Sequence, residues 1–311
     1  MLIRFFKSSY SGQYMVLLIL LGALWLPVFL YPTQIRQSAN IVPFWDLLVY
    51  LFNGSQLLAA SISIFVVFIS SLILNQILSY YDLIPKNSLE GAFVYVVFAG
   101  ILASTDWIGP LLFANFFFLI LLNVILKLYE EKEAYRTVFS LGILNAVIFL
   151  FYPPFLFLII PVYVVIVLMG NVRWRELFIP LVGLAVPLIF TFVFYFMVDK
   201  TAYFTEYFLS DFTDFKIFNP DYPTTFWILI VLSGILLLAA LLNIFGNISA
   251  KNIDIRKKLM TLIHFLLFSF MVFLFLQSEY HSLEILIVPL SAVVAYYLSQ
   301  LKKAIKPEII V

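Results

Sequence analysis

Long apolar stretches dominate the chain, and charges, prolines and polar clusters separate them. The stretch from Val138 to Gly170 contains no charged residue. A hydrocarbon core about 30 Å thick needs roughly 20 mostly apolar residues per helical crossing, so this pattern is typical of transmembrane helices. An outer-membrane barrel would instead alternate apolar and polar residues. The pattern predicts ten spans, near residues 14–31, 57–79, 90–104, 109–127, 137–152, 154–170, 177–198, 225–246, 259–276 and 283–300.

These spans predict an all-α, polytopic transmembrane helix bundle that forms a single domain over residues 1–311. The sequence shows no internal repeat of fixed period and no low-complexity linker that would divide it. At the N-terminus, Arg4 and Lys7 precede the first apolar run as in a signal peptide. The run ends in Trp25–Phe29 without a small-x-small cleavage site, so we interpret it as an uncleaved first span.

Two places leave an alternative to the ten-span count. Residues 138–170 form either one long helix kinked at Pro153-Pro154 or two short helices joined there. Consecutive prolines remove two backbone donors and crowd the preceding turn, which favours the hairpin. The second place is Ser104–Pro110, where an acid, a glycine and a proline favour a tight outer turn over a mid-membrane kink.

The distribution of Lys and Arg orients the predicted bundle. Positively charged residues accumulate in cytoplasmic loops because they resist translocation. With both termini in the cytoplasm, fifteen of the 18 Lys and Arg residues fall inside and three fall outside, and a single helix over 138–170 would export Arg173 and Arg175. The three outer cations are Arg36, Lys200 and Lys216.

Two outer loops are longer than a turn requires. Residues 43–53 of the first loop place Asp46, Tyr50 and Asn53 on one helical face and begin with a proline, which predicts a helix in the outer interface. The fourth outer loop, 199–224, spaces phenylalanines at helical intervals opposite polar residues. It predicts a second interfacial helix, which ends at the breakers in 219–223.

Composition excludes several classes of function. The chain is 64% hydrophobic and only 11% charged, which excludes a soluble enzyme with a membrane anchor. It has no cysteine and only two histidines, so thiolate chemistry, haem and multi-histidine metal sites are not expected. The net charge of +1 provides no basic patch for nucleic acid. We therefore expect neither a cofactor nor a nucleic-acid partner.

Outer carboxylates are the first candidates for chemistry. Asp46 and Asp106 each lie next to a tryptophan in an apolar neighbourhood. Burial there would raise the pKa of a carboxyl group and suit a general base. An interfacial acid beside an aromatic-belt tryptophan is the alternative interpretation of each.

Other polar groups support weaker hypotheses. Asp211 and Asp214 are three residues apart on one helical face and could share a divalent cation such as Mg²⁺. His281 could pair with Glu284 and bind a phosphate, or it could be an exposed turn residue. His264, inside the ninth span, is either functional or satisfied by its surroundings. The inner cluster around Lys251 could hold anionic headgroups, although topology alone would explain it.

The segments Met1–Tyr10 (MLIRFFKSSY) and Leu24–Pro27 (LWLP) resemble an uncharacterised family of polytopic inner-membrane proteins from Gram-negative bacteria. That resemblance covers nearly the full chain and implies a place in the bacterial inner membrane. The predicted layout also resembles, more distantly, the C-type (GT-C) membrane glycosyltransferases.

The glycosyltransferase resemblance implies that Asp46 is the catalytic acid of the first loop, with Asp106 as a second candidate. It also implies that the loop 199–224 covers a polyprenyl-phosphate-linked sugar. Arg36, Lys200 and His281 are then the candidates to bind the lipid phosphate. The sequence departs from the family pattern in having one acid in the first loop and no soluble outer domain.

A non-enzymatic subunit or scaffold of an envelope assembly or secretion machine, with membrane-protein partners, is the alternative function. Transport has less support, because no Lys or Arg lies in the interior of a predicted span, Lys127 being the last residue of its span, and no matching broken helices recur in the two halves.

Overall fold

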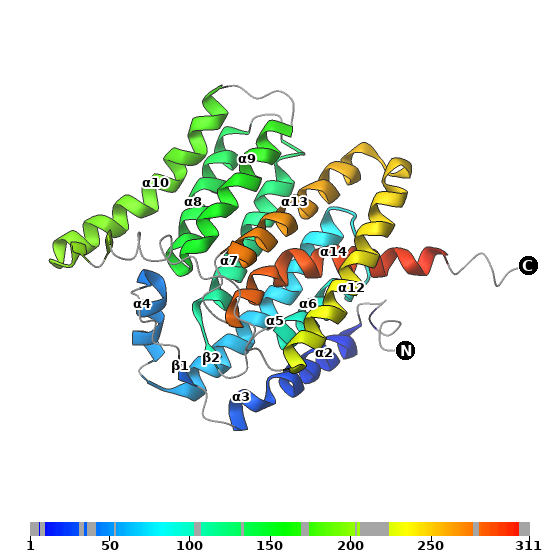
Figure 1. Ribbon diagram of the computed structural model, residues 1–311, viewed down its shortest axis with the longest axis horizontal. Coiled ribbons are helices and arrows are strands. Elements are labelled where there is room, and N and C mark those ends of the chain that lie inside the picture. Colours follow the sequence, from blue (N-terminus) through cyan, green and yellow to red (C-terminus); the bar gives the residue numbers. More distant parts are fainter. Residues whose placement is uncertain are drawn as a thin grey trace, which may run out of the picture.

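The structure, a computed structural model, describes residues 6, 10–30, 34–35, 42–52, 54–102, 107–131, 134–168, 174–202, 204–205, 224–275 and 280–304. The described part is helical apart from two strands of two residues each (Figure 1). Its elements are α2 (Ser11–Leu24), α3 (Leu26–Leu30), β1 (Gln34–Ile35), α4 (Pro43–Phe52), α5 (Gln56–Tyr80), α6 (Glu90–Leu102), β2 (Trp107–Ile108), α7 (Pro110–Lys127), α8 (Tyr135–Phe151), η1 (Pro153–Leu158), α9 (Ile159–Leu168), α10 (Trp174–Met197), α12 (Thr224–Asn247), η2 (Ile248–Ala250), α13 (Ile253–Phe275), η3 (Tyr280–Leu286) and α14 (Ile287–Ala304).

Six of the described helices are long and apolar enough to cross a membrane by length and composition, namely α5, α7, α10, the part of α12–η2 from Ile230, α13 and the η3–α14 segment. The protein is therefore membrane-embedded. The predicted spans near 14–31, 90–104, 137–152 and 154–170 also fall on apolar helices, but these have only 10–17 residues. The ten-span count and its orientation stay predictions. In Figure 1 the start of α2 and the end of α14 lie at the same end of the bundle.

Local sequence signals set several helix ends. Pro110 occupies the first turn of α7 after the N-cap Gly109. Helix α8 ends at Phe151, and the extended residue Tyr152 separates it from the two prolines. Residues 138–168 therefore form two helical segments, α8 and η1–α9, and not one continuous helix. The carboxamide oxygen of Asn75 accepts bonds from the amides of Gly91 and Ala92 at 3.0 and 3.3 Å, which caps the start of α6.

Helices α5, α6, α7, α8 and α14 form the interior of the bundle, and α10 and α12 lie at its periphery (Figure 1). We compare the most apolar 18-residue stretch of each span, which we call its apolar window. In the η3–α14 span 83% of the residues in this window are buried, but in α10 only 11% are buried and in the α12 span, Ile230–Ala250, also only 11%. Helix α10 lies closely along α8. A Cβ atom added to Gly142 of α8 would collide with the carbonyl oxygen of Pro180, and one added to Gly183 of α10 would collide with that of Phe139. These two glycines therefore allow backbone-to-backbone contact.

Helix α4, in the loop predicted to be the first outer one, begins at Pro43, as predicted. Its buried residues include Trp45 and Phe52, which contact the ring of Phe113 with centroid distances of 5.9 and 6.5 Å. Leu47, Tyr50 and Leu51 form an exposed face. The helix is thus anchored on α7 and presents its other face outward, which suits an interfacial position.

Candidate functional site

Asp46 lies in the first turn of α4 and is half-buried. Its carboxylate accepts a hydrogen bond from the amide of Val42 at 3.1 Å, while its own amide donates to the Val42 carbonyl at 2.8 Å. Burial raises the pKa of the Asp46 carboxyl group, and the bond from Val42 offsets part of that rise. The sequence predicted Asp46 and Tyr50 on the same helical face. In the structure Tyr50 is 82% exposed, whereas Asp46 is half-buried.

Asp46 lies in the neighbourhood of the C-terminal end of α10. Tyr195 of α10 lies within electrostatic reach of the Asp46 carboxylate. The ring of Tyr195 also contacts Phe204, with a centroid distance of 6.2 Å. The Tyr195 carbonyl accepts a bond from the amide of Lys200 at 2.9 Å. This brings the backbone of Lys200, whose side chain is exposed, to the same corner of the molecule as Asp46.

Asp199 completes this turn with a φ of 56°, in the left-handed region. Three successive amides, those of Val198, Asp199 and Lys200, bond back to carbonyls of the last turn of α10. A left-handed residue just past a helix end is the usual device that closes such a turn. It fixes the direction in which the chain leaves α10 beside Asp46.

The other predicted site residues cannot be placed. Arg36, Asp106, Asp211 and Asp214 lie outside the described residues, and His281 is described only by its backbone in η3. Parallel pairing of β1 with β2 matches Gln34 to Trp107 and Ile35 to Ile108. The pairing thus joins the segments that directly precede Arg36 and directly follow Asp106. Among the described residues no three His, Asp or Glu side chains come together to hold a metal ion.

A buried polar cluster lies between η3 and the central helices. Glu284, which was interpreted as part of an outer turn, is only 4% exposed. Its carbonyl accepts a bond from the carboxamide of Asn115, on α7, at 2.8 Å. The hydroxyl of Tyr95, on α6, lies close to Ser70 of α5 and within electrostatic reach of Glu284. The sequence did not predict this cluster, because its members come from four separate elements.

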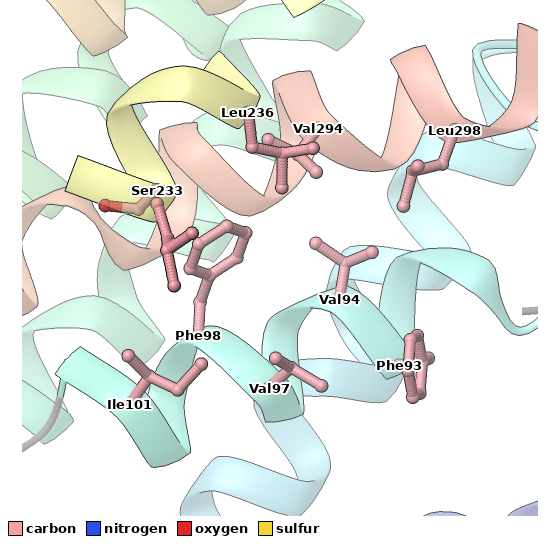
Figure 2. A pocket seen from close by; sticks show the side chains of 10 residues that line it. Phe93, Val94, Val97, Phe98, Ile101, Ser233, Leu236, Val294 and Leu298 are labelled. Atoms are coloured by element: carbon pink, nitrogen blue, oxygen red, sulfur yellow. The ribbon is translucent and has the colours of Figure 1, made fainter. Parts of the chain in front are cut away.

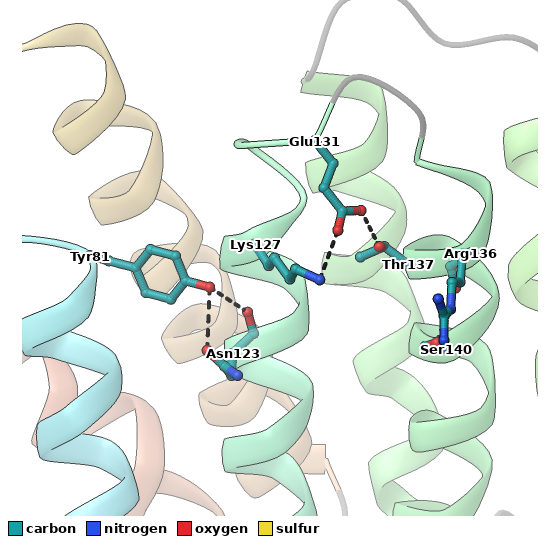
Figure 3. A network of polar contacts seen from close by, with 7 residues as sticks. All are labelled: Tyr81, Asn123, Lys127, Glu131, Arg136, Thr137 and Ser140. Carbon is teal, nitrogen blue, oxygen red and sulfur yellow. Dashed lines mark hydrogen bonds and ion pairs between the residues drawn. The ribbon is translucent and has the colours of Figure 1, made fainter.

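At the C-terminal end of α7, a network of polar contacts joins this helix to the residue that follows α5 and to the start of α8 (Figure 3). The hydroxyl of Tyr81 donates to the carbonyl of Asn123 at 3.0 Å. Lys127 pairs with Glu131 at 2.9 Å, and the Thr137 hydroxyl donates to the same carboxylate. The Thr137 bond and then Lys127 hold the pKa of Glu131 below its ordinary value.

Two further contacts stabilise this end of the bundle. Lys258 is buried, pairs with Glu130 at 3.2 Å and lies 4.8 Å from the ring centre of Tyr81. A ring nitrogen of His264 contacts the Met260 carbonyl of its own helix at 2.6 Å. The contact gives His264 a partner within its own helix, which is consistent with its interpretation as a side chain satisfied by its surroundings.

A cavity of about 300 Å³ lies between α6, α12 and α14 (Figure 2). Val94 and Phe98 of α6 face Val294 and Leu298 of α14 across it, and α12 closes one side. Ser233 is the single polar residue of the lining, and its hydroxyl donates to the Ile230 carbonyl of its own helix at 2.9 Å. We call this cavity the α6–α12–α14 crevice. It is apolar and does not involve Asp46.

Comparison with known proteins identifies the chain only at the level of a family. No curated protein and no solved structure matches it. The family profile that does match covers residues 39–311, from just before α4 to the end of the chain. The chain therefore belongs to a family of unknown function, DUF6427.

Proposed function

We propose that the protein is a GT-C-like glycosyltransferase that acts on a polyprenyl-phosphate-linked sugar at the periplasmic face of the bacterial inner membrane. Asp46 is the general base. The proposed topology has ten spans, with both termini in the cytoplasm. The observation that carries the proposal is the half-buried Asp46 carboxylate with a raised pKa, on an anchored interfacial helix next to the end of α10.

The proposed reaction requires one proton transfer at Asp46. Its ionised carboxylate takes the proton from an acceptor hydroxyl as that oxygen attacks the anomeric carbon of the sugar. The bond between this carbon and the polyprenyl phosphate breaks, and the phosphate leaves with the bond electrons. Lys200 supplies positive charge for the phosphate at the same corner. Arg36 and His281 assist it, and Asp106 is the alternative base.

The enzyme hypothesis is tested by mass spectrometry of lipid-linked glycans in a deletion strain. We expect one lipid-linked sugar to accumulate and the wild-type gene to restore the normal profile. Asp46→Asn keeps the shape of the side chain but removes the base, so it should fail to restore the profile while inserting normally. Asp254→Asn, which changes an exposed acid at the start of α13, is the matched control and should restore it.

Two outcomes would overturn the proposal. If Asp46→Asn restores the profile, Asp46 is not the general base. If the lipid-linked glycan profile of the deletion strain is unchanged, the protein does not catalyse the proposed reaction. Immunoblots of the membrane fraction separate loss of activity from loss of protein.

The second candidate is a non-enzymatic subunit of an envelope assembly or secretion machine. It is favoured by the two peripheral helices, α10 and α12, of whose apolar windows only 11% is buried. A partner subunit could cover such faces instead of lipid. Loss of an envelope complex in the deletion strain, without a change in lipid-linked glycans, would support this function over the enzyme.

A further inference from the structure

The α6–α12–α14 crevice has the size and chemistry of a hydrocarbon-chain site. Its volume of about 300 Å³ is at the lower end of the range for small-molecule sites. Along α6 its lining runs from Phe93 to Ile101, which corresponds to about 12 Å of helix. One leaflet of the hydrocarbon core is roughly 15 Å thick. The crevice therefore matches most of the depth of one leaflet.

The lining offers an occupant nothing but apolar contact. Nine of its ten residues are hydrophobic, and the hydroxyl of Ser233 is already bonded within α12. The flanking helices α12 and η3–α14 are both long enough to cross the membrane, so the crevice lies among hydrocarbon chains. A polar ligand would lose its hydrogen bonds there without replacement.

Two cations that form no ion pair among the described residues lie near one end of the crevice. Lys251, which follows α12 and η2, donates to the Gln300 side chain at 3.1 Å, two residues beyond the lining residue Leu298. The guanidinium of Arg256 donates to the Lys251 carbonyl at 3.4 Å. Asp254 lies between them in the sequence but forms no ion pair with either among the described side chains.

Two other described lysines at this end of the bundle contrast with this pair, whereas the exposed Lys257 resembles it in having no ion pair among the described residues. Lys127 and Lys258 each have a glutamate partner, at 2.9 and 3.2 Å. A lysine ammonium carries three donors, and the Gln300 contact uses one of those of Lys251. The positive charge beside the crevice is therefore available to an anion at the membrane surface.

We propose that the protein binds one anionic glycerophospholipid, with an acyl chain in the α6–α12–α14 crevice and its phosphate at Lys251 and Arg256. The lipid belongs to the leaflet on the side of the α12–α13 turn. It fills the space between α12 and the interior helices and secures α12 to them. The proposal does not depend on the glycosyltransferase function, because the site shares no residue with the Asp46 corner.

Native mass spectrometry of the full chain tests this site. The protein is reconstituted into nanodiscs of equimolar phosphatidylglycerol and phosphatidylcholine and then transferred to a mild detergent, and retained phospholipids are identified. Wild-type protein should retain one phospholipid, with phosphatidylglycerol preferred. Lys251→Gln should lower the ratio of retained phosphatidylglycerol to phosphatidylcholine by about fivefold, the factor expected for one interfacial cation.

Filling the crevice should instead reduce retention of both lipids. Leu236→Trp fills it from α12, and Leu298→Trp fills it from α14 as an independent second variant. Leu242→Trp is the matched control, because Leu242 lies on α12 at 67% exposure and does not line the crevice. Thermal unfolding of each variant shows that it is folded.

Retention by both filled variants at the wild-type level would overturn the chain site. An unchanged lipid ratio in Lys251→Gln would overturn the headgroup site. Wild-type protein that retains no phospholipid, whether because a second copy or another protein fills the crevice, would overturn both.

Discussion

Helices α10 and α12 have the same length of 24 residues and the same small buried share of 11% in their apolar windows, yet they are attached in different ways. Helix α10 lies on α8 with its backbone in contact at Gly142 and Gly183. Helix α12 approaches the interior through side chains and leaves the α6–α12–α14 crevice. In a bilayer, lipid tails are as apolar as leucine, so close approach rather than buried area determines how firmly a helix is held.

The glycines show this difference most directly. A Cβ atom on Gly183 would lie 3.2 Å from the Cα of Gly142 and would overlap the Phe139 carbonyl. On Gly234 of α12 it would meet no atom within 4 Å. The two positions thus form a matched pair for mutation.

The largest effect is expected from Gly183→Leu. The side chain has no space between α8 and α10, so the helices must separate, and we expect the free energy of unfolding to fall by about 3 kcal/mol or more. Gly234→Leu, the control, should change it by less than about 0.5 kcal/mol. Thermal unfolding in detergent measures both. Equal losses in the two variants would contradict the comparison.

A smaller difference is expected between two leucine truncations. Leu141 is fully buried on α8 beside Gly142, so Leu141→Ala should lower the free energy of unfolding by about 2–5 kcal/mol. Leu236 borders an existing cavity, and Leu236→Ala removes fewer packed contacts, so its loss should be about 1 kcal/mol or less. Denaturant titrations of both variants at one detergent concentration check this. A larger loss for Leu236→Ala would mean that α12 is packed as tightly as α8.

The smallest effect concerns Glu131, at the start of the α7–α8 connection, and pH. The folded pKa of Glu131 is lowered, so its ionised form stabilises the folded state above the unfolded pKa, and this contribution is lost as pH falls through the folded value. Glu131→Gln should lower the melting temperature at neutral pH by the equivalent of about 1 kcal/mol or less. The difference from wild type should disappear in acid.

A control variant at Asp46 sharpens this measurement. Asp46 has a raised pKa, so its contribution has the opposite sign and declines as pH rises through its folded value. Asp46→Asn should therefore not change the loss of stability in acid that results from protonation of Glu131. A difference between wild type and Glu131→Gln that grows in acid would contradict the assigned shift.

Features that depend on neighbouring residues were predictable from the sequence. The two prolines after Tyr152 predicted the end of α8, and Pro43 predicted the start of α4, because proline restricts its own turn wherever it occurs. The apolar neighbours of Asp46 left its burial open beside an interfacial position, and the structure shows it half-buried. Such signals are local and need no knowledge of the partner helix.

Features that depend on distant partners were not predictable. Glu284 has the sequence context of an exposed turn, but it is buried, and its backbone carbonyl accepts a hydrogen bond from Asn115, 169 residues away. The same holds for Gly142 and Gly183, whose contact arises from the crossing of α8 and α10. A uniformly apolar sequence shows which segments are helices but contains little information about which faces meet.

The pairing of β1 with β2 also constrains the order in which the chain can be assembled. Gln34 and Trp107 are roughly seventy residues apart, and α5 and α6 lie between them. During synthesis, the backbone groups of β1 therefore cannot pair with β2 until α5 and α6 have been made and residues 107–108 have emerged. Because unpaired backbone groups are costly next to a bilayer, the segment from α4 to the start of α7 should mature as one unit. In a chain whose synthesis is stalled before Trp107, β1 has no β2 to pair with.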